Sequence, residues 1–314
     1  MRNTLFAIGE ALIDFIPSET GCDFSEIGAF SPKIGGAPAN VLGAFSKLGG
    51  KTQLITQLGD DPFGHKIAAA LEKFNIGLEY VRFTKCANTA LAFVSLEKDG
   101  KRTFSFYRNP SADMLYGGEN LDAASFSDCF ALHFCSVSLG NFPMKEAHKK
   151  AINLAKQSGA AVSFDPNIRL PLWSDTGALK KAVEEFLPMA DVIKVSDEET
   201  EFITGTKDIE EGCKKLLKTA KLVICTCGEN GCYAFTENAQ AFAPSEKVKA
   251  CDTTGAGDAF IGSFLYSLHR NGCDKAKLHL LTDDKLREFL KASSAYCGKS
   301  VQKYGAIESY PDSI

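Results

Sequence analysis

Several features that would assign a protein to a large functional class are missing from this chain of 314 residues. No apolar run approaches the length of a membrane span. The net charge of −4 does not favour binding to nucleic acid or to an anionic membrane. The five histidines form no H-x-x-x-H pattern, and Cys225 and Cys227 form a C-x-C with no second pair at zinc spacing. We therefore expect no nucleic-acid partner, no membrane partner and no zinc site of the usual spacing.

We also expect no signal peptide, because Met1–Thr4 leads at once into a strand-like segment. Most of the 11 cysteines lie in apolar strand-like or helical contexts, which is typical of buried thiols. We therefore expect a cytoplasmic protein.

Common nucleotide and hydrolase motifs are missing as well. The chain contains no G-x-x-x-x-G-K-[ST] loop, no H-R-D or D-F-G, no G-x-S-x-G, and no G-x-G-x-x-G after its first strand-like segment. A phosphoryl transferase built from this chain must therefore stabilise charge with backbone amides, Mg²⁺ and an arginine rather than with a P-loop lysine.

What is present is an alternation of short apolar runs with segments of helical periodicity. It predicts a single α/β domain over residues 1–314, with a mostly parallel central sheet covered by helices on both faces. Such sheets bind ligands at the carboxyl ends of their strands. Strands are expected at Phe6–Gly9, Gln53–Gln57, Ala131–Cys135, Ala161–Asp165, Asp191–Val195 and Leu222–Cys225. Helices are expected at Pro38–Leu48, Phe63–Phe74, Pro143–Gln157, Gly177–Leu187, Asp197–Thr204, Glu210–Thr219, Ala256–Arg270 and Asp283–Gln302.

One excursion, around residues 89–108, breaks the alternation. Two β-rich runs, Thr89–Glu97 and Arg102–Arg108, flank the turn-forming segment Lys98–Lys101 and predict a hairpin. Phe104 and Phe106 share one face of the second strand. Aromatic residues on a hairpin away from the main sheet indicate a lid or a partner surface.

The most informative segment is Asp252–Asp258, where a loop turns into a helix. Gly255 and Gly257 remove side chains where backbone N–H groups leave the first turn, and the helix dipole adds positive potential, so the segment predicts an anion site. Asp258, inside that field, could accept a proton from a nucleophile that attacks the bound anion. A helix start with an acidic first turn is the plainer interpretation.

Four other clusters fall at expected strand-to-helix turns. Asp14 could accept two sugar hydroxyl hydrogens, and Gly35–Asn40 combines close backbone approach with an amide for a polyol. Arg169 offers a fork of donors to phosphate or hydroxyl, and Thr226–Gly231 forms a small-residue turn suited to a nucleotide. The plainer interpretations are a turn aspartate, a loop-to-helix junction, a surface ion pair and a hairpin turn.

Together these residues make the chain resemble the ribokinase (pfkB-type) family of sugar kinases over essentially its whole length. Both family signatures, Gly35–Asn40 and Asp252–Asp258, are present, and Leu58–Gly64 and Asp165–Arg169 match in the family's order. The segments Phe106–Leu115 and Lys194–Glu199 look most like those of fructokinases. The resemblance implies a three-layer sandwich with a mostly parallel central sheet and a small β-hairpin lid.

The resemblance also implies a role for each matching residue. Asp258 would be the base, and Gly255, Ala256 and Gly257 would form the anion hole for the γ-phosphate. Glu199 would be tied indirectly to Mg²⁺, and Asp252 and Thr254 match positions that bind a monovalent cation such as K⁺. The sugar would be bound by Asp14, Gly35, Gly36, Asn40, Phe106, Arg108 and Arg169. The ATP site would include Lys194, Thr226, Gly228 and Gly231.

Three positions depart from the family pattern. Ser196 stands where the family's Asn-x-x-Glu begins, Ser294 stands where many relatives carry an asparagine facing the nucleotide, and Leu42 replaces a small residue. These three residues are therefore not counted as site residues.

The resulting interpretation is an ATP-dependent sugar kinase that converts D-fructose to fructose 6-phosphate, with a homodimer through the lid as the expected partner. The alternatives within the class are a 2-keto-3-deoxygluconate kinase and a ribose or nucleoside kinase. An alternative of a different class is a non-catalytic sugar sensor on the same fold, although binding alone does not require a base at Asp258.

Overall fold

The computed structural model describes residues 2–19, 21, 24–96, 102–173 and 175–314. Its larger sheet has nine strands in the order β13-β12-β11-β10-β9-β8-β1-β4-β5, and only β12 and β13 pair antiparallel to their neighbours. The predicted mostly parallel sheet is therefore confirmed. In chain order its strands are β1 (Thr4–Ile8), β4 (Lys51–Gly59), β5 (Val81–Thr84), β8 (Cys129–Cys135), β9 (Ala161–Asp165), β10 (Val192–Ser196), β11 (Leu222–Thr226), β12 (Cys232–Phe235) and β13 (Gln240–Ala243).

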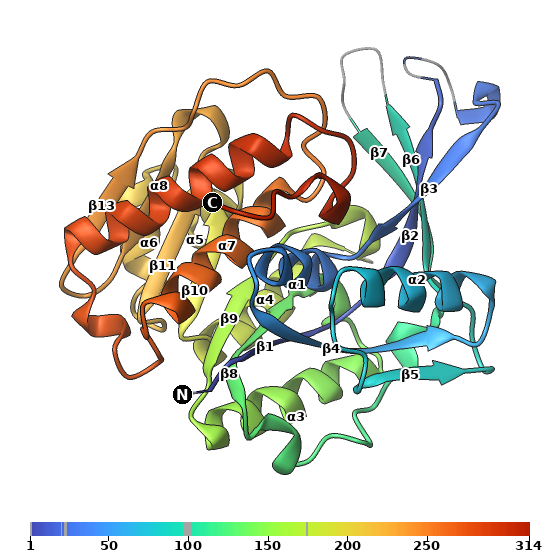
Figure 1. The fold of residues 1–314 in the computed structure, drawn as a ribbon, viewed down its shortest axis with the longest axis horizontal. Coiled ribbons are helices and arrows are strands. Elements are labelled where there is room, and N and C mark those ends of the chain that lie inside the picture. The colour runs from blue at the N-terminus through green and yellow to red at the C-terminus, as the bar shows by residue number, and fades with distance from the viewer. Residues whose placement is uncertain (1, 20, 22–23, 97–101, 174) are drawn as a thin grey trace.

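Helices cover both faces of this sheet (Figure 1). Strand β1 shows why, since Leu5 and Ala7 lie in one hydrophobic core while Phe6 and Ile8 lie in the other. The first core also takes residues of α1 (Ala37–Lys47), α2 (Pro62–Lys73), α7 (Ala256–Arg270) and α8 (Asp283–Ser300). The second takes residues of α3 (Pro143–Ser158), α4 (Thr176–Phe186) and α6 (Ile209–Leu216), beside the short helix α5 (Asp197–Thr204).

A second sheet projects from the body of the molecule (Figure 1). Its strand order is β3-β2-β6-β7, and we call these four strands the lid. They are β2 (Leu12–Pro17), β3 (Phe30–Gly35), β6 (Leu91–Leu96) and β7 (Arg102–Tyr107). The antiparallel pairing of β6 with β7 agrees with the predicted hairpin, whereas its turn, Lys98–Lys101, lies outside the described residues.

The lid is larger than the predicted hairpin, because β2 and β3 join β6 and β7 in one four-stranded sheet. Strand β2 continues from β1 after a three-residue break, so its apolar residues look like the end of a core strand. Strand β3 contains Pro32, which removes an amide donor, but β3 is an edge strand and tolerates it.

Helices α1 and α7 cross at very short range. Gly262 of α7 faces α1, and a Cβ on it would lie 2.6 Å from the carbonyl oxygen of Val41. This contact requires glycine and brings the first turns of the two helices together.

None of the described helices is both long and apolar enough to cross a membrane. The ten cysteines among the described residues are free thiols. Six of them are buried, and Cys86 and Cys251 are exposed, so the expectation of buried thiols holds for most of them.

Candidate active site

The first turn of α7 has the geometry of an anion site. Gly255 precedes the helix with a φ of 70°, and a Cβ on it would lie 2.5 Å from the Tyr310 hydroxyl oxygen. That hydroxyl donates to the Gly255 carbonyl oxygen at 2.8 Å and fixes the loop. The N–H groups of a helix's first turn have no intrahelical acceptor, so this turn can bind phosphate oxygens.

Asp258 lies in the same turn and is only 6% exposed. Its Oδ2 accepts a hydrogen bond from Asn40 Nδ2 at 2.9 Å, and its Oδ1 accepts one from Asn167 Nδ2 at 3.2 Å. Burial raises the pKa of Asp258 from 3.8 to about 6, although the hydrogen bond from Asn40 opposes the rise. A carboxylate with this pKa is ionised at neutral pH and is also basic enough to accept a proton.

Two cavities meet at this turn. The larger, of about 460 Å³, is lined by Ala256, Gly257 and Phe260, and the smaller, of about 290 Å³, by Thr254, Gly255 and Asp258. Thr253 lines both. An anion held by the first turn of α7 would therefore lie between the two cavities, with Asp258 on the side of the smaller one.

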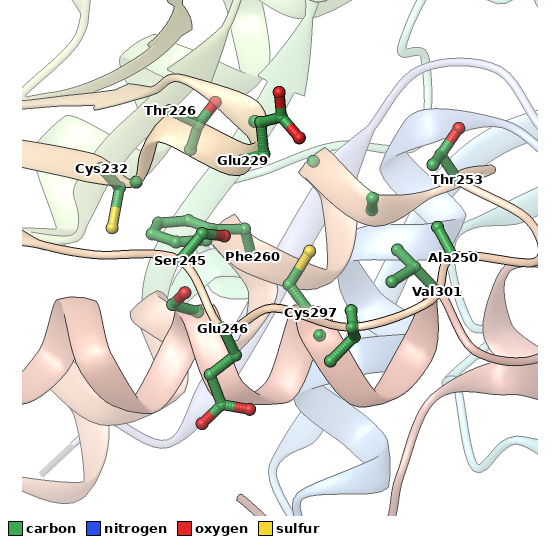
Figure 2. A pocket seen from close by; sticks show the side chains of 17 residues that line it. Thr226, Glu229, Cys232, Ser245, Glu246, Ala250, Thr253, Phe260, Cys297 and Val301 are labelled. Carbon is green, nitrogen blue, oxygen red and sulfur yellow. The ribbon is translucent and has the colours of Figure 1, made fainter.

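The larger cavity lies between the turn after β11 and one face of α8 (Figure 2). We call it the nucleotide-side cavity. The predicted residues Thr226, Gly228 and Gly231 line it. Further lining comes from the segment after β13, where Ser245 and Ala250 point toward the cavity (Figure 2).

The smaller cavity lies beneath the lid, and we call it the sugar-side cavity. Of the predicted sugar residues, Asp14, Gly36, Asn40, Phe106 and Arg169 line it. The strand register explains two of them, because Asp14 pairs with Ala92 and Ala92 pairs with Phe106, which places all three side chains on one face of the lid. The Oδ1 atom of Asn40 is buried without a protein partner and can accept a hydrogen bond from a hydroxyl.

Gly35 and Arg108 do not line the sugar-side cavity. Gly35 instead lies against the Asp14 carboxylate, where there is no room for a Cβ. Arg108 is buried, forms an ion pair with Asp113 and donates from Nη1 to the Val137 carbonyl oxygen at 3.0 Å. Arg108 therefore contacts Val137, which lines the sugar-side cavity, but does not line the cavity itself, and its role in sugar binding stays a prediction.

A buried ion pair supports the anion turn from the sheet. Lys194 of β10 lies 2.9 Å from Asp165 Oδ2, and a Cβ on Gly257 would lie 3.0 Å from Lys194 Nζ. The pKa of Lys194 is raised because Asp165 and Glu199 outweigh its burial. Lys194 therefore brings a positive charge close beneath the anion turn, although it does not line either cavity.

Glu199 forms a capping box with Ser196 at the start of α5. Its Oε2 accepts from the Ser196 amide at 2.9 Å, and its Oε1 accepts from the Ile168 amide at 2.7 Å. Burial and the neighbouring Asp165 raise the pKa of Glu199. Since both oxygens already accept backbone hydrogen bonds, Glu199 is better placed to act on a metal through water than to ligate it directly.

The predicted monovalent-cation residues lie on the loop before α7. Asp252 Oδ1 accepts from the amide and the hydroxyl of Thr254 at 2.9 and 2.7 Å, and Asp252 Oδ2 accepts from the Gly305 amide at 2.9 Å. The Asp252 carboxylate thus joins the loop before α7 to the segment around Gly305, which follows α8. Among the described residues no group of three histidine, cysteine, aspartate or glutamate side chains gathers at metal-binding distance.

The structure adds site residues that the sequence interpretation omitted. Ser294, Cys297, Gly298 and Val301 line the nucleotide-side cavity at one-face helical spacing, so the period of α8 could have indicated them. Asn167 belongs to the segment Asp165–Arg169, which the sequence had indicated. Its φ of 44° is rare for a residue with a side chain. Glu10, the second residue after β1, also lines the sugar-side cavity.

Comparison with known proteins identifies relatives of the whole chain. Residues 2–313 match the model of the pfkB family carbohydrate kinases. Fructokinase-2 of Zea mays is 42% identical over 312 residues, which are 99% of this chain and 92% of that protein. The structure of fructokinase with bound ATP from Xylella fastidiosa has a TM-score of 0.89 at 33% identity, covering 99% of this chain and 96% of the other. A double mutant of Vibrio cholerae fructokinase in fructose, ADP and potassium ion bound form has a TM-score of 0.86 at 31% identity, with the same coverage.

Proposed function

Because the chain belongs to the pfkB family of carbohydrate kinases, we propose that it transfers the γ-phosphate of ATP to the 6-hydroxyl of D-fructose. The observation that carries the proposal is the position of Asp258, a buried carboxylate in an anion-binding helix turn between two cavities. Full-length relatives that are fructokinases, one of them with bound ATP and another with bound fructose, support the choice of both substrates.

In the proposed reaction Asp258 is the general base. It takes the proton of the sugar hydroxyl while the hydroxyl oxygen bonds to the γ-phosphorus and the β,γ-bridging oxygen leaves with ADP. The amides of Gly255, Ala256 and Gly257 stabilise the charge on the transferring group. Lys194, close beneath Gly257, adds positive potential.

The same proposal assigns the two cavities to the two substrates. Asp14, Gly36, Asn40 and Arg169 bind the sugar, and Phe106 covers it from the lid. The nucleotide can approach the backbone at small residues, which are Thr226 at the end of β11 and Gly228 and Gly231 in the turn after it.

Two ions belong to the proposal. Mg²⁺ bound with ATP would neutralise phosphate charge and would need few protein ligands, because phosphate oxygens and waters can supply most of them. Glu199 is the residue that would hold it, through a water rather than directly. A monovalent cation, K⁺ in the first instance, is held beside Asp252 and Thr254, and its presence in the Vibrio cholerae structure supports this choice.

We expect a homodimer that forms through the face of the lid opposite to Asp14 and Phe106. This face carries an aromatic cluster in which Phe15 stacks on Phe93 with ring centroids 4.6 Å apart, and Phe93 contacts Tyr107 at 5.3 Å. Tyr107 is 61% exposed and Phe24, which also contacts Phe93, is 44% exposed. A second copy pairing through this face would bury the cluster, and Tyr107→Ser should then shift the sedimentation coefficient toward that of the monomer.

A turnover assay across sugars tests the proposal. With saturating Mg-ATP, kcat/KM is measured for fructose, 2-keto-3-deoxygluconate, ribose and a nucleoside. Fructose is expected to have the highest value. A tenfold advantage for the keto acid would instead assign Arg169 to a substrate carboxylate, and binding of fructose without any turnover would indicate a sugar sensor.

A further inference from the structure

A buried polar bridge connects the end of lid strand β7 with the sugar-side cavity. Arg108, the residue after β7, donates from Nη2 to Ser138 Oγ at 3.0 Å. Ser138 Oγ donates in turn to Glu10 Oε2 at 2.7 Å. Asp113 neutralises Arg108, accepting from its Nε at 3.0 Å. The bridge therefore runs from Arg108 at the end of the lid, through Ser138 in the turn after β8, to Glu10, the second residue after β1.

Glu10 is the last residue of this bridge, and it lines the sugar-side cavity. It is 2% exposed and lines the cavity beside Leu12 and Val137. Burial raises the pKa of Glu10, while the Arg108 charge and the hydrogen bond from Ser138 lower it. Oε2 of Glu10 already accepts from Ser138, but a carboxylate can accept several hydrogen bonds, so a hydroxyl of a bound polyol can donate a further one to Glu10.

The charges around this cavity select between kinds of sugar. Glu10, Asp14 and Asp258 present three carboxyl groups, whereas Arg169 is the one basic side chain among the described residues that line the cavity. The Arg108 guanidinium is committed to Asp113 and Ser138. Carboxylates accept hydrogen bonds from hydroxyls and repel a substrate carboxylate, so the cavity suits a neutral polyol.

We propose that Glu10 is a specificity-determining residue that accepts a hydrogen bond from a hydroxyl of a neutral sugar and excludes sugar acids, with Ser138 and Arg108 as positioning residues that hold its carboxylate. The inference rests on the proposed sugar kinase function and concerns the choice among its substrates.

The test compares Glu10→Gln, Glu10→Asp and Ser138→Ala with wild type, and Glu72→Gln serves as a control because Glu72 is exposed on α2. For each protein kcat and KM are measured for fructose, for 2-keto-3-deoxygluconate and for ATP. Glu10→Gln keeps the shape but removes the charge, so its kcat/KM for fructose should fall about 10- to 100-fold, and the fructose-to-keto-acid ratio should fall at least about tenfold.

The other variants separate specificity from folding. Glu10→Asp keeps the charge and should therefore keep the fructose-to-keto-acid ratio of kcat/KM. Its shorter side chain should lower the affinity for fructose. Ser138→Ala should raise KM for fructose about three- to tenfold while KM for ATP stays within about twofold. Glu72→Gln should match wild type.

The outcomes distinguish this inference from the proposed function. Wild type that phosphorylates none of the sugars overturns both. If wild type phosphorylates fructose, and the ratio of kcat/KM for fructose to kcat/KM for the keto acid in Glu10→Gln stays within twofold of the wild-type ratio, only the inference about Glu10 is overturned. If Glu10→Gln does not fold, Ser138→Ala decides, and an unchanged KM for fructose in that variant rejects the bridge.

Discussion

Replacement of Asp258 by asparagine should remove most of the turnover and leave most of the sugar binding. Loss of a general base lowers kcat by about 10²- to 10⁴-fold, which is about 2.7 to 5.4 kcal/mol of transition-state stabilisation. Asparagine has nearly the same volume, and its oxygen can still accept from Asn40 or Asn167, which lie 2.9 and 3.2 Å from the carboxylate. KM for the sugar should therefore change by only about threefold or less.

The pH dependence gives a second measure of the same carboxylate. Since burial raises the pKa of Asp258 to about 6, wild-type kcat should fall about tenfold per pH unit below pH 6 and reach a plateau above it. Asp258→Asn should not show this fall of kcat at acid pH, which we call the acid limb. The hydrogen bond from Asn40 lowers the pKa of Asp258, so Asn40→Leu should move the limb to higher pH.

The assay is coupled detection of ADP between pH 5 and 9, with thermal melting to verify folding. Asp312→Asn is the matched control, because Asp312 is exposed and pairs only with Lys47 in the described ion pairs. Retention of more than about a tenth of wild-type kcat by Asp258→Asn, or an unchanged acid limb, would refute the assignment of the base.

Three further predictions concern the anion turn, the lid and the buried ion pair. Gly255→Ala should lower the free energy of unfolding by about 1 to 3 kcal/mol and also lower kcat, whereas Gly49→Ala, at a similar positive φ but with no atom within 4 Å, should leave kcat unchanged. Phe106→Ala opens the sugar-side cavity to water and should raise the ratio of ATP hydrolysis to sugar phosphorylation; an unchanged ratio would remove the lid from the mechanism. Lys194→Met should lower the free energy of unfolding by about 3 to 5 kcal/mol by urea titration, and addition of Asp165→Asn should restore part of it, because the loss comes from a buried charge without its partner.

The main sheet could be predicted from sequence because each of its central strands is buried on both faces. Runs such as Leu222–Cys225 are continuous and apolar, and the helices between them have 3.6-residue periods and capping signals such as Ser196. The lid was only half predicted. Strands β2 and β3 have mixed burial and contain Pro17 and Pro32, so neither period nor propensity marks them.

The site could be predicted where one short segment supplies both backbone and side chain. Gly255 and Asp258 are of this kind, since glycine and carboxylate lie within one helical turn. The position of Arg108 could not be predicted, because its partners Asp113, Val137 and Ser138 come from two later segments. Glu10 was missed for a similar reason, as nothing in its neighbours indicates that Ser138 lies beside it in space.

The environment of Asp258 explains why its neighbours matter as much as the carboxylate itself. Burial and the nearby Asp165 raise its pKa, while Asn40 and Lys194 lower it, and the balance of about 6 combines ionisation at neutral pH with useful basicity. Asn40 of α1 donates to Asp258 of α7, and Gly262 lets these two helices approach closely. A larger residue at position 262 would separate the helices and weaken this hydrogen bond. Residue 262 lines neither cavity, yet we expect a larger side chain there to move the acid limb of kcat to higher pH, because the hydrogen bond from Asn40 lowers the pKa of Asp258.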